Sequence, residues 1–338
     1  MKQKNVLRSL LIAFSTFITF AILIYIIKPQ NLRDSILNLS LGWTALFFVV
    51  FVFVYALRSY RWKLLLKSEI TDISYMIAYR TMHISRFINS VTPARMGEVA
   101  RLYSLKKEKN LPVGETIGKI TVENILDIMI LLIFSVLSMM LVLRTQSIPT
   151  ISFYITIIAF VVVTIIALGT FLLFYRGNRL ITIIARISKK LAAKLSVVHK
   201  TFQQGLSDLK THDKRVGATV ALTFVMWFCE LLLVYVISRA MSLDIPFWIC
   251  IYAGSIAILS LTIPLLPGGF GSYEVAMASL LVISGISLES ALTLAFIDHA
   301  LRMFYLLCLG PPFMIKTGVN ISNIKKESYS IEKELSPP

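Results

Sequence analysis

Long apolar runs separated by short polar segments dominate the chain and predict membrane-spanning helices. A hydrocarbon core about 30 Å thick needs roughly 20 apolar residues per helix, and about six runs are predicted to cross it. They cover residues 10–27, 43–57, 117–143, 151–175, 218–237 and 290–315. The first run lacks a small-residue cleavage site, so we interpret it as an uncleaved span rather than a signal peptide. The pattern therefore predicts an all-α, polytopic membrane protein.

Two further apolar segments are interrupted and predict re-entrant hairpins. They cover residues 73–112, which carry too many charges for a lipid-facing span, and the region from 246 to 286. The interrupting residues are Pro93 and Gly97 in the first, and Pro267, Gly268, Gly269 and Gly271 in the second. Helices that stop halfway are tolerated only where protein or a water-filled cavity satisfies the freed backbone groups. We expect one hairpin to enter from the cytoplasm and the other from outside, with a polar cavity between them.

The two breaks resemble each other locally. In each, a glycine stands four residues after a proline, and an acid follows soon afterwards, at Glu98 or Glu274. Opposed broken helices in opposite halves of a chain are typical of inverted-repeat carriers. Proline and glycine also recur by chance, so an inverted repeat and a coincidence both explain the match.

The basic residues predict topology. The net charge is +16, and most of the 34 lysines and arginines fall in alternate connections between the spans. Cytoplasmic flanks of spans gather such residues, so we expect both termini in the cytoplasm, in a plasma-membrane protein. We interpret the basic surface as contact with anionic inner-leaflet lipids and not as a nucleic-acid site. Five residues are predicted to anchor the second span at the cytoplasmic interface: Arg58, Arg61, Trp62, Lys63 and Lys67.

The rest of the chain predicts one domain. Residues 1–318 form a single transmembrane domain, and residues 319–338 a disordered cytoplasmic tail. Within the domain, residues 176–215 have one apolar face, which fits a helix on the inner leaflet or one packed beneath the spans. The 3 cysteines and 4 histidines show no spacing typical of a disulfide framework or a metal site, so we expect neither metal nor cofactor.

Ionisable residues inside spans are costly and often mark function. The predicted polar cavity takes its charges from Glu98, Glu123, Asp127, Glu274, Asp298 and Arg302. Glu123 and Asp127 share a helix face, which fits a proton- or cation-coupling site or acceptors for a polar headgroup, or else a salt bridge to an arginine of the first hairpin. Asp298 and Arg302 can pair with each other, and Glu274 fits an acidic helix start.

The arginines of the first hairpin suggest an anion site. Arg95 and Arg101 adjoin a broken helix whose free N–H groups attract anions, and guanidinium binds phosphate bidentately. With Arg86 and Asn89 they form the predicted site for a phosphate-bearing lipid headgroup. Alternatively, Arg101 belongs to the basic belt and Arg95 pairs with a buried acid.

The ordered set of these residues resembles a flippase-like membrane family that includes the transmembrane region of lysylphosphatidylglycerol synthases. The matching residues are Arg58, Arg61, Trp62, Leu64, Leu65, Asn89, Pro93, Arg95, Gly97, Glu98, Arg101, Glu123, Asp127, Pro267, Gly268, Gly269, Gly271, Glu274, Arg302, Tyr305 and Gly310. The chain departs from the family pattern at Ala94, often glycine, and at Asn124, often arginine. Such synthases carry a soluble aminoacyl-transferase domain after their spans, and we expect none in this chain.

The resemblance implies movement of a phospholipid, or of a polyprenyl-phosphate-linked sugar, between leaflets. An alternative is a membrane-embedded transferase acting on a lipid-linked sugar or an aminoacyl lipid, although no catalytic motif supports it. Another is a non-transporting assembly subunit. An assembly subunit would act with an enzyme partner. A homo-oligomer is compatible with the carrier, the transferase and the assembly subunit.

Overall fold

The computed structural model describes residues 25–67, 72–92, 96–109, 111, 113–145, 179–186, 213–262 and 266–335, with scattered positions at 21 and between 161 and 203. Every regular element in this part of the chain is a helix, which confirms the predicted fold class. The predicted spans at residues 10–27 and 151–175 lie almost wholly outside the described residues, as does most of the 176–215 connection.

Four long helices form the frame of the molecule. They are α3 (Leu41–Leu66), α6 (Val113–Thr145), α9 (Asp213–Ala240) and α12 (Leu288–Thr317). Each contains a stretch long and apolar enough to cross a membrane, so four of the predicted spans are confirmed. The side chain of Ser287 caps the start of α12, and Gly318 ends it in the left-handed conformation that favours glycine.

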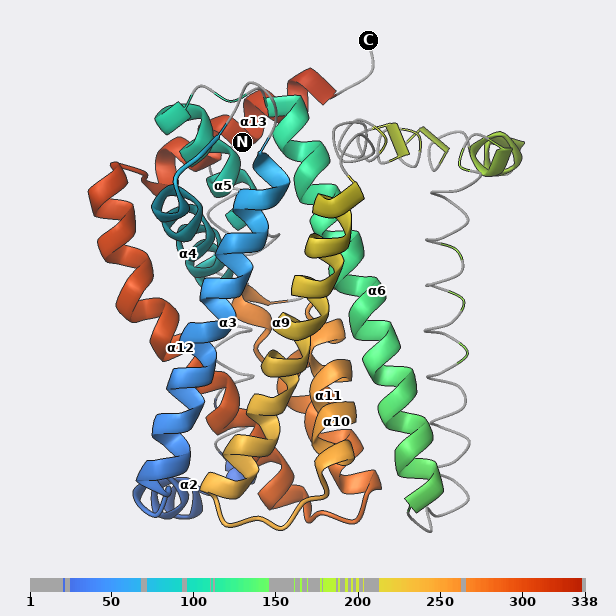
Figure 1. Cartoon of the computed structure of the whole chain (residues 1–338). Coiled ribbons are helices and arrows are strands. Elements are labelled where there is room, and N and C mark those ends of the chain that lie inside the picture. The colour runs from blue at the N-terminus through green and yellow to red at the C-terminus, as the bar shows by residue number, and fades with distance from the viewer. Residues whose placement is uncertain are drawn as a thin grey trace.

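Two pairs of short helices stand between the long ones. α4 (Tyr75–Val91) and α5 (Met96–Lys109) form the first pair. The second pair is α10 (Phe247–Ser260) and α11 (Ser272–Ile283), with a 3₁₀ turn, η1 (Pro267–Gly269), between them. Each helix is shorter than the roughly 20 residues needed to cross a bilayer. The pairs lie toward opposite ends of the long helices (Figure 1), as predicted for two opposed hairpins.

The tips of the two hairpins meet inside the bundle. η1 packs against α4, and a Cβ atom on Gly268 would lie 3.0 Å from the carbonyl oxygen of Ser90. Gly268, Gly269 and Gly271 all have positive φ, which lets the second hairpin turn tightly at this contact. Pro267 and these three glycines therefore form the turn where the second hairpin touches the first.

The arrangement supports an inverted repeat. The order long, short, short, long occurs twice, in α3 to α6 and in α9 to α12. In this order α3 corresponds to α9, α4 to α10, and α6 to α12. Packing has the same symmetry, because α3 packs on α9, and the contact of α4 with α12 has its counterpart in that of α10 with α6. The similarity of the two breaks in sequence is therefore matched by a similar order and packing of the helices around them.

The C-terminal segment differs from the prediction of disorder for residues 319–338. Helix α13 covers Ile321–Leu335 and packs on α5 at one end of the bundle (Figure 1). Ile324 is fully buried in an apolar cluster with Ile84, Ile88 and Ala100, and Lys106 pairs with Glu327 at 2.7 Å. Docking of this helix depends on the surface that α4 and α5 present in the folded bundle, which the polar composition of the segment does not reveal. Residues 336–338 lie outside the described part.

Candidate functional site

A cavity of about 240 Å³ lies between the two hairpins and the long helices. Six of the predicted site residues line it: Arg86, Asn89, Glu98, Arg101, Asp127 and Arg302. Gly268 and Gly269 at the tip of the second hairpin line it as well. Because a water molecule occupies about 30 Å³ of liquid, this volume accommodates several waters or a headgroup phosphate.

Arg61 is the centre of the first ion-pair cluster. Its guanidinium is fully buried and donates to Glu123 at 2.8 Å and to both carboxylate oxygens of Asp127. It also donates to the hydroxyl of Thr223 on α9, 3.0 Å away. Arg61 therefore joins α3, α6 and α9.

Arg101 completes this cluster from the first hairpin. It donates to the second oxygen of Glu123 at 2.6 Å, and its guanidinium lies 4.0 Å from the ring centroid of Trp62. Asp127 additionally accepts from the indole N–H of Trp227 at 2.8 Å. Two arginines thus balance two carboxylates, which is the condition for keeping charges in a low-dielectric interior.

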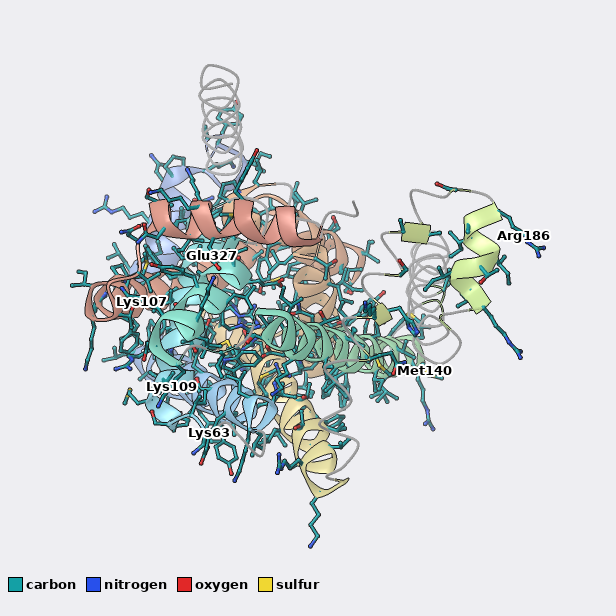
Figure 2. The ribbon with its side chains drawn as sticks, turned by 90° about the horizontal axis from the view of Figure 1, so that it is seen from above. Lys63, Lys107, Lys109, Met140, Arg186 and Glu327 are labelled. Carbon is teal, nitrogen blue, oxygen red and sulfur yellow. The ribbon has the colours of Figure 1, made fainter. Side chains whose placement is uncertain are left out.

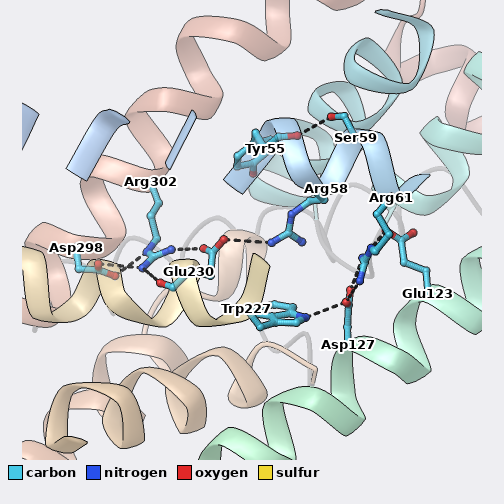
Figure 3. Close-up of polar contacts among 10 residues, drawn as sticks. All are labelled: Tyr55, Arg58, Ser59, Arg61, Glu123, Asp127, Trp227, Glu230, Asp298 and Arg302. Carbon is cyan, nitrogen blue, oxygen red and sulfur yellow. Dashed lines mark hydrogen bonds and ion pairs between the residues drawn. The ribbon is translucent and has the colours of Figure 1, made fainter. Parts of the chain in front are cut away.

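The second cluster joins α12, α9 and α3 (Figure 3). Arg302 binds both oxygens of Asp298, at 2.7 and 3.1 Å, and also pairs with Glu230. Glu230 in turn accepts from Arg58 at 3.2 Å, and Tyr273 donates to Asp298 at 2.5 Å. The predicted Asp298–Arg302 pair is present, but it is part of a larger cluster that is also balanced.

The interpretation of Arg58, Arg61 and Trp62 as interfacial anchors was wrong. Their exposed fractions are 3%, 0% and 0%. All three lie on the face of α3 that points into the bundle, where carboxylates of α6 and α9 compensate the arginines. The sequence held a signal for this placement, since the carboxylates on α6 and α9 need cationic partners.

Arg86 differs from these paired arginines. It lines the cavity and has no hydrogen bond or ion pair with any residue in the described ranges. Arg58 also lines the cavity, and its Nη1 is buried without a partner in the described part of the chain. Asn89 uses its side-chain oxygen to accept from the backbone N–H of Gly97 at 2.7 Å, which fixes the start of α5.

Glu274 fulfils the predicted role at a helix start and has an additional partner. One of its oxygens accepts from the backbone N–H of Gly271 at 2.7 Å. The other lies 2.6 Å from Nδ1 of His299, a cavity-lining residue of α12. Sequence reasoning missed His299 because it treated the histidines as candidate metal ligands only.

The remaining predicted residues fall into two groups. Glu123, Asp298 and Glu274 lie behind the cavity wall, each paired with a residue that lines it: Arg101, Arg302 and His299. Pro93 and Arg95 lie outside the described residues, so the predictions for them stay predictions.

These features define a polytopic helical membrane protein with a charged internal cavity between two opposed re-entrant hairpins. Residues 6–310 match the family model described as the lysylphosphatidylglycerol synthase transmembrane region. The chain belongs to this family.

Several curated proteins are similar to the chain. A UPF0104 membrane protein of Methanocaldococcus jannaschii is 26% identical, with 72% of this chain and all of the relative aligned. One of Pyrococcus horikoshii is 23% identical over 80% of this chain and 85% of the relative. Glycosyltransferase AglD of Haloferax volcanii is 22% identical over 95% of this chain and 57% of its own length. No solved structure matches.

Proposed function

We propose that this protein moves a lipid with a phosphate-bearing headgroup, either a phospholipid or a polyprenyl-phosphate-linked sugar, from one membrane leaflet to the other. The observation that carries the proposal is Arg86, a cation on the wall of an internal cavity with no partner among the described residues. Arg86 is partly buried on this wall, and an ionisable side chain in a membrane-spanning bundle normally faces a partner or a cavity. A ligand that brings an anion into the cavity would pair with this guanidinium.

The chemistry of the wall favours phosphate. Guanidinium groups bind phosphate oxygens bidentately, and Arg58 has a spare Nη1 donor close to the same cavity. The other arginines on the wall, Arg101 and Arg302, are already neutralised by carboxylates. Glu98 and Asn124 lie on the wall too and offer hydrogen bonds to the hydroxyl or amino groups of a headgroup.

The hairpins supply the route. Both line the cavity, and they approach it from opposite ends of the bundle (Figure 1). A headgroup held between them sits where small movements of either hairpin would open it to a different leaflet, as in carriers with opposed broken helices.

The basic residues indicate how the protein is oriented in the membrane. Lys63, Lys107 and Lys109 gather at the end that carries α13, as seen from above in Figure 2. By the positive-inside rule we place this end, with both termini, at the cytoplasmic face of the plasma membrane. The same lysines are suited to anionic inner-leaflet lipids.

The test is lipid movement in proteoliposomes of phosphatidylcholine that carry a fluorescent phosphatidylglycerol, with extraction by albumin as the readout of the outer leaflet. We expect Arg86→Gln to slow movement by about tenfold or more, because a hydrogen bond to a charged group contributes about 1.5–3 kcal/mol. Arg80→Gln is the matched control: it removes the same charge from α4, but Arg80 pairs with Glu108 at 2.9 Å and does not line the cavity. Equal rates for wild type and the Arg86 variant would refute the assigned site.

The similarity to glycosyltransferase AglD over 95% of this chain favours one alternative, a transferase acting on a lipid-linked sugar. Formation of a glycolipid from a labelled activated sugar donor, by the purified protein in detergent, would support that alternative. Lipid movement without any donor would favour the carrier.

A further inference from the structure

The two hairpins carry equivalent carboxylate sites that differ in one residue. Glu98 is the third residue of α5, and Glu274 is the third residue of α11. Each carboxylate has a partner at the twelfth position of the following long helix: Asn124 on α6 and His299 on α12. Asn124 Nδ2 donates to Glu98 at 3.1 Å, and His299 Nδ1 lies 2.6 Å from Glu274.

The register of the other charged residues supports this equivalence. Arg58 and Glu230 are each the eighteenth residue of their helix, α3 and α9. Glu123 and Asp298 are each the eleventh residue of theirs, α6 and α12. Asn124 and His299 therefore stand at corresponding places, and what distinguishes them is that an imidazole can gain a proton and an amide cannot.

The hydrogen bonds of Glu274 fix the state of His299. Both carboxylate oxygens are acceptors, one for Gly271 N–H and one for the imidazole. A carboxylate only accepts hydrogen bonds, so Nδ1 is the donor in this contact and carries the hydrogen. Nε2 is then the atom that gains or loses a proton, and it is buried without a partner in the described part of the chain. Phe270 and Tyr273 hold the ring, with centroids 4.7 and 4.6 Å away.

The charges around His299 decide how a proton there would act. On its own helix, Asp298 and Arg302 neutralise each other together with Glu230 of α9 and Arg58 of α3. From α4, Arg86 faces the same cavity, and from α11, Glu274 touches the ring. Glu98, Asp127 and Arg101 lie on the wall farther around, in pairs or hydrogen bonds of their own. A proton on Nε2 would turn the contact with Glu274 into an ion pair and create a new donor.

We propose that Glu274 and His299 form a proton-binding site that takes up a proton when a phosphodiester headgroup binds in the cavity. The inference rests on the proposed function and deepens it, since it makes binding of the lipid proton-linked. The bound phosphate oxygens stabilise the protonated ring, and the protonated ring stabilises the bound phosphate. A ligand that binds with proton uptake binds more tightly as the pH falls, by at most about tenfold per pH unit for one proton.

The chain itself supplies the variant that tests this site. His299→Asn copies the residue at the equivalent position of the other hairpin, where an amide bonds a glutamate without titrating. It keeps a donor for Glu274 and removes the proton acceptor. His83→Gln is the control, because His83 is also buried but does not line the cavity.

The probe is dihexanoyl phosphatidylglycerol, a soluble lipid whose phosphodiester does not titrate between pH 5 and 8. Calorimetry in two buffers of different ionisation enthalpy counts the protons taken up per lipid bound. Histidine changes charge in this pH range. We expect wild type and His83→Gln to take up a substantial fraction of one proton near pH 6.5, with affinity that falls several-fold between pH 5.5 and 7.5. In His299→Asn we expect almost no uptake and an affinity that does not depend on pH.

The outcomes separate the inference from the function beneath it. Binding by wild type without proton uptake overturns the proton-linked site and leaves the carrier proposal standing. Equal uptake by His299→Asn assigns the proton to another group and also overturns it. If wild type binds the lipid at no pH in this range, the phosphodiester site and its coupling both fall. The proton uptake of the wild-type protein can be measured without any variant. If His299→Asn folds poorly, Glu274→Gln serves as a second variant of the same site.

Discussion

Glu230 of α9 connects the other two long helices of the second ion-pair cluster, α3 and α12. Its carboxylate lies between Arg58 and Arg302, and the three residues are at most 7% exposed. Removing one partner of a buried pair leaves an uncompensated charge, and that penalty usually exceeds the net contribution of the pair itself. The charge balance of the cluster therefore matters more than any single contact in it.

We predict that Glu230→Gln and Arg58→Gln each destabilise the protein by about 3–5 kcal/mol, because each leaves the cluster with an unpaired charge. The double variant restores neutrality, since Arg302 and Asp298 still pair. Its cost should fall short of the sum of the single costs by about 1–3 kcal/mol. Unfolding in detergent followed by circular dichroism measures all three.

Arg144→Gln is the control for this cycle, because Arg144 is exposed at the end of α6. A change within about 0.5 kcal/mol is expected there. Strict additivity of the Glu230 and Arg58 costs would contradict the charge-balance argument.

The hairpin of α4 and α5 depends on the close approach of its two helices. A Cβ atom on Gly97 would overlap the backbone carbonyl oxygen of Ser85 and would lie 2.7 Å from the side-chain oxygen of Asn89. A backbone atom cannot move aside as the end of a flexible side chain can. Gly97 is therefore required by packing, in addition to its place beside the break.

We predict that Gly97→Ala lowers the free energy of unfolding by about 1–3 kcal/mol, the usual cost of overpacking. Gly217→Ala should instead raise it by up to about 1 kcal/mol, because a Cβ atom on this helical glycine of α9 would meet no other atom within 4 Å and alanine favours the helix. The same unfolding measurement compares the two. Equal effects at both positions would show that α4 and α5 do not approach as closely as described.

The two ends of the molecule differ in surface charge, although the interior is built from two similar halves. Basic side chains gather at the α13 end, whereas the connection between α9 and α10 at the other end carries the fully exposed Asp244. An inverted repeat makes the interior similar from both sides, so the surface charges must set the orientation in the membrane.

We predict that cysteine labelling reports opposite sides for the two ends. In a Cys308→Ser background, Asp244→Cys should react with a membrane-impermeant maleimide in intact cells, and Lys109→Cys only after the cells are permeabilised. Cys308 is replaced because it is an exposed native thiol. The background protein without an added cysteine is the control, and the reverse labelling pattern would invert the proposed topology.

The distribution of apolar residues was sufficient to predict four of the long helices and both broken hairpins, because a bilayer imposes a length of about 20 residues on any span. Helical periodicity also placed Glu123 with Asp127, and Asp298 with Arg302, on shared faces. The helical α13 was not predicted, because Ile324 is buried against a surface of α4 and α5 that exists only in the folded bundle.

The sequence by itself determined that the four long helices are apolar enough to cross a membrane and that Glu123, Asp127, Asp298 and Arg302 lie within them. The tertiary structure decided how those charges pair: Arg61 meets Glu123 across 62 residues of chain, and Arg58 meets Glu230 across 172. It therefore decided that Arg86 is left without a partner in the described region and that His299 faces a carboxylate. The reason is that periodicity fixes neighbours along one helix, whereas partners on different helices depend on how the helices pack.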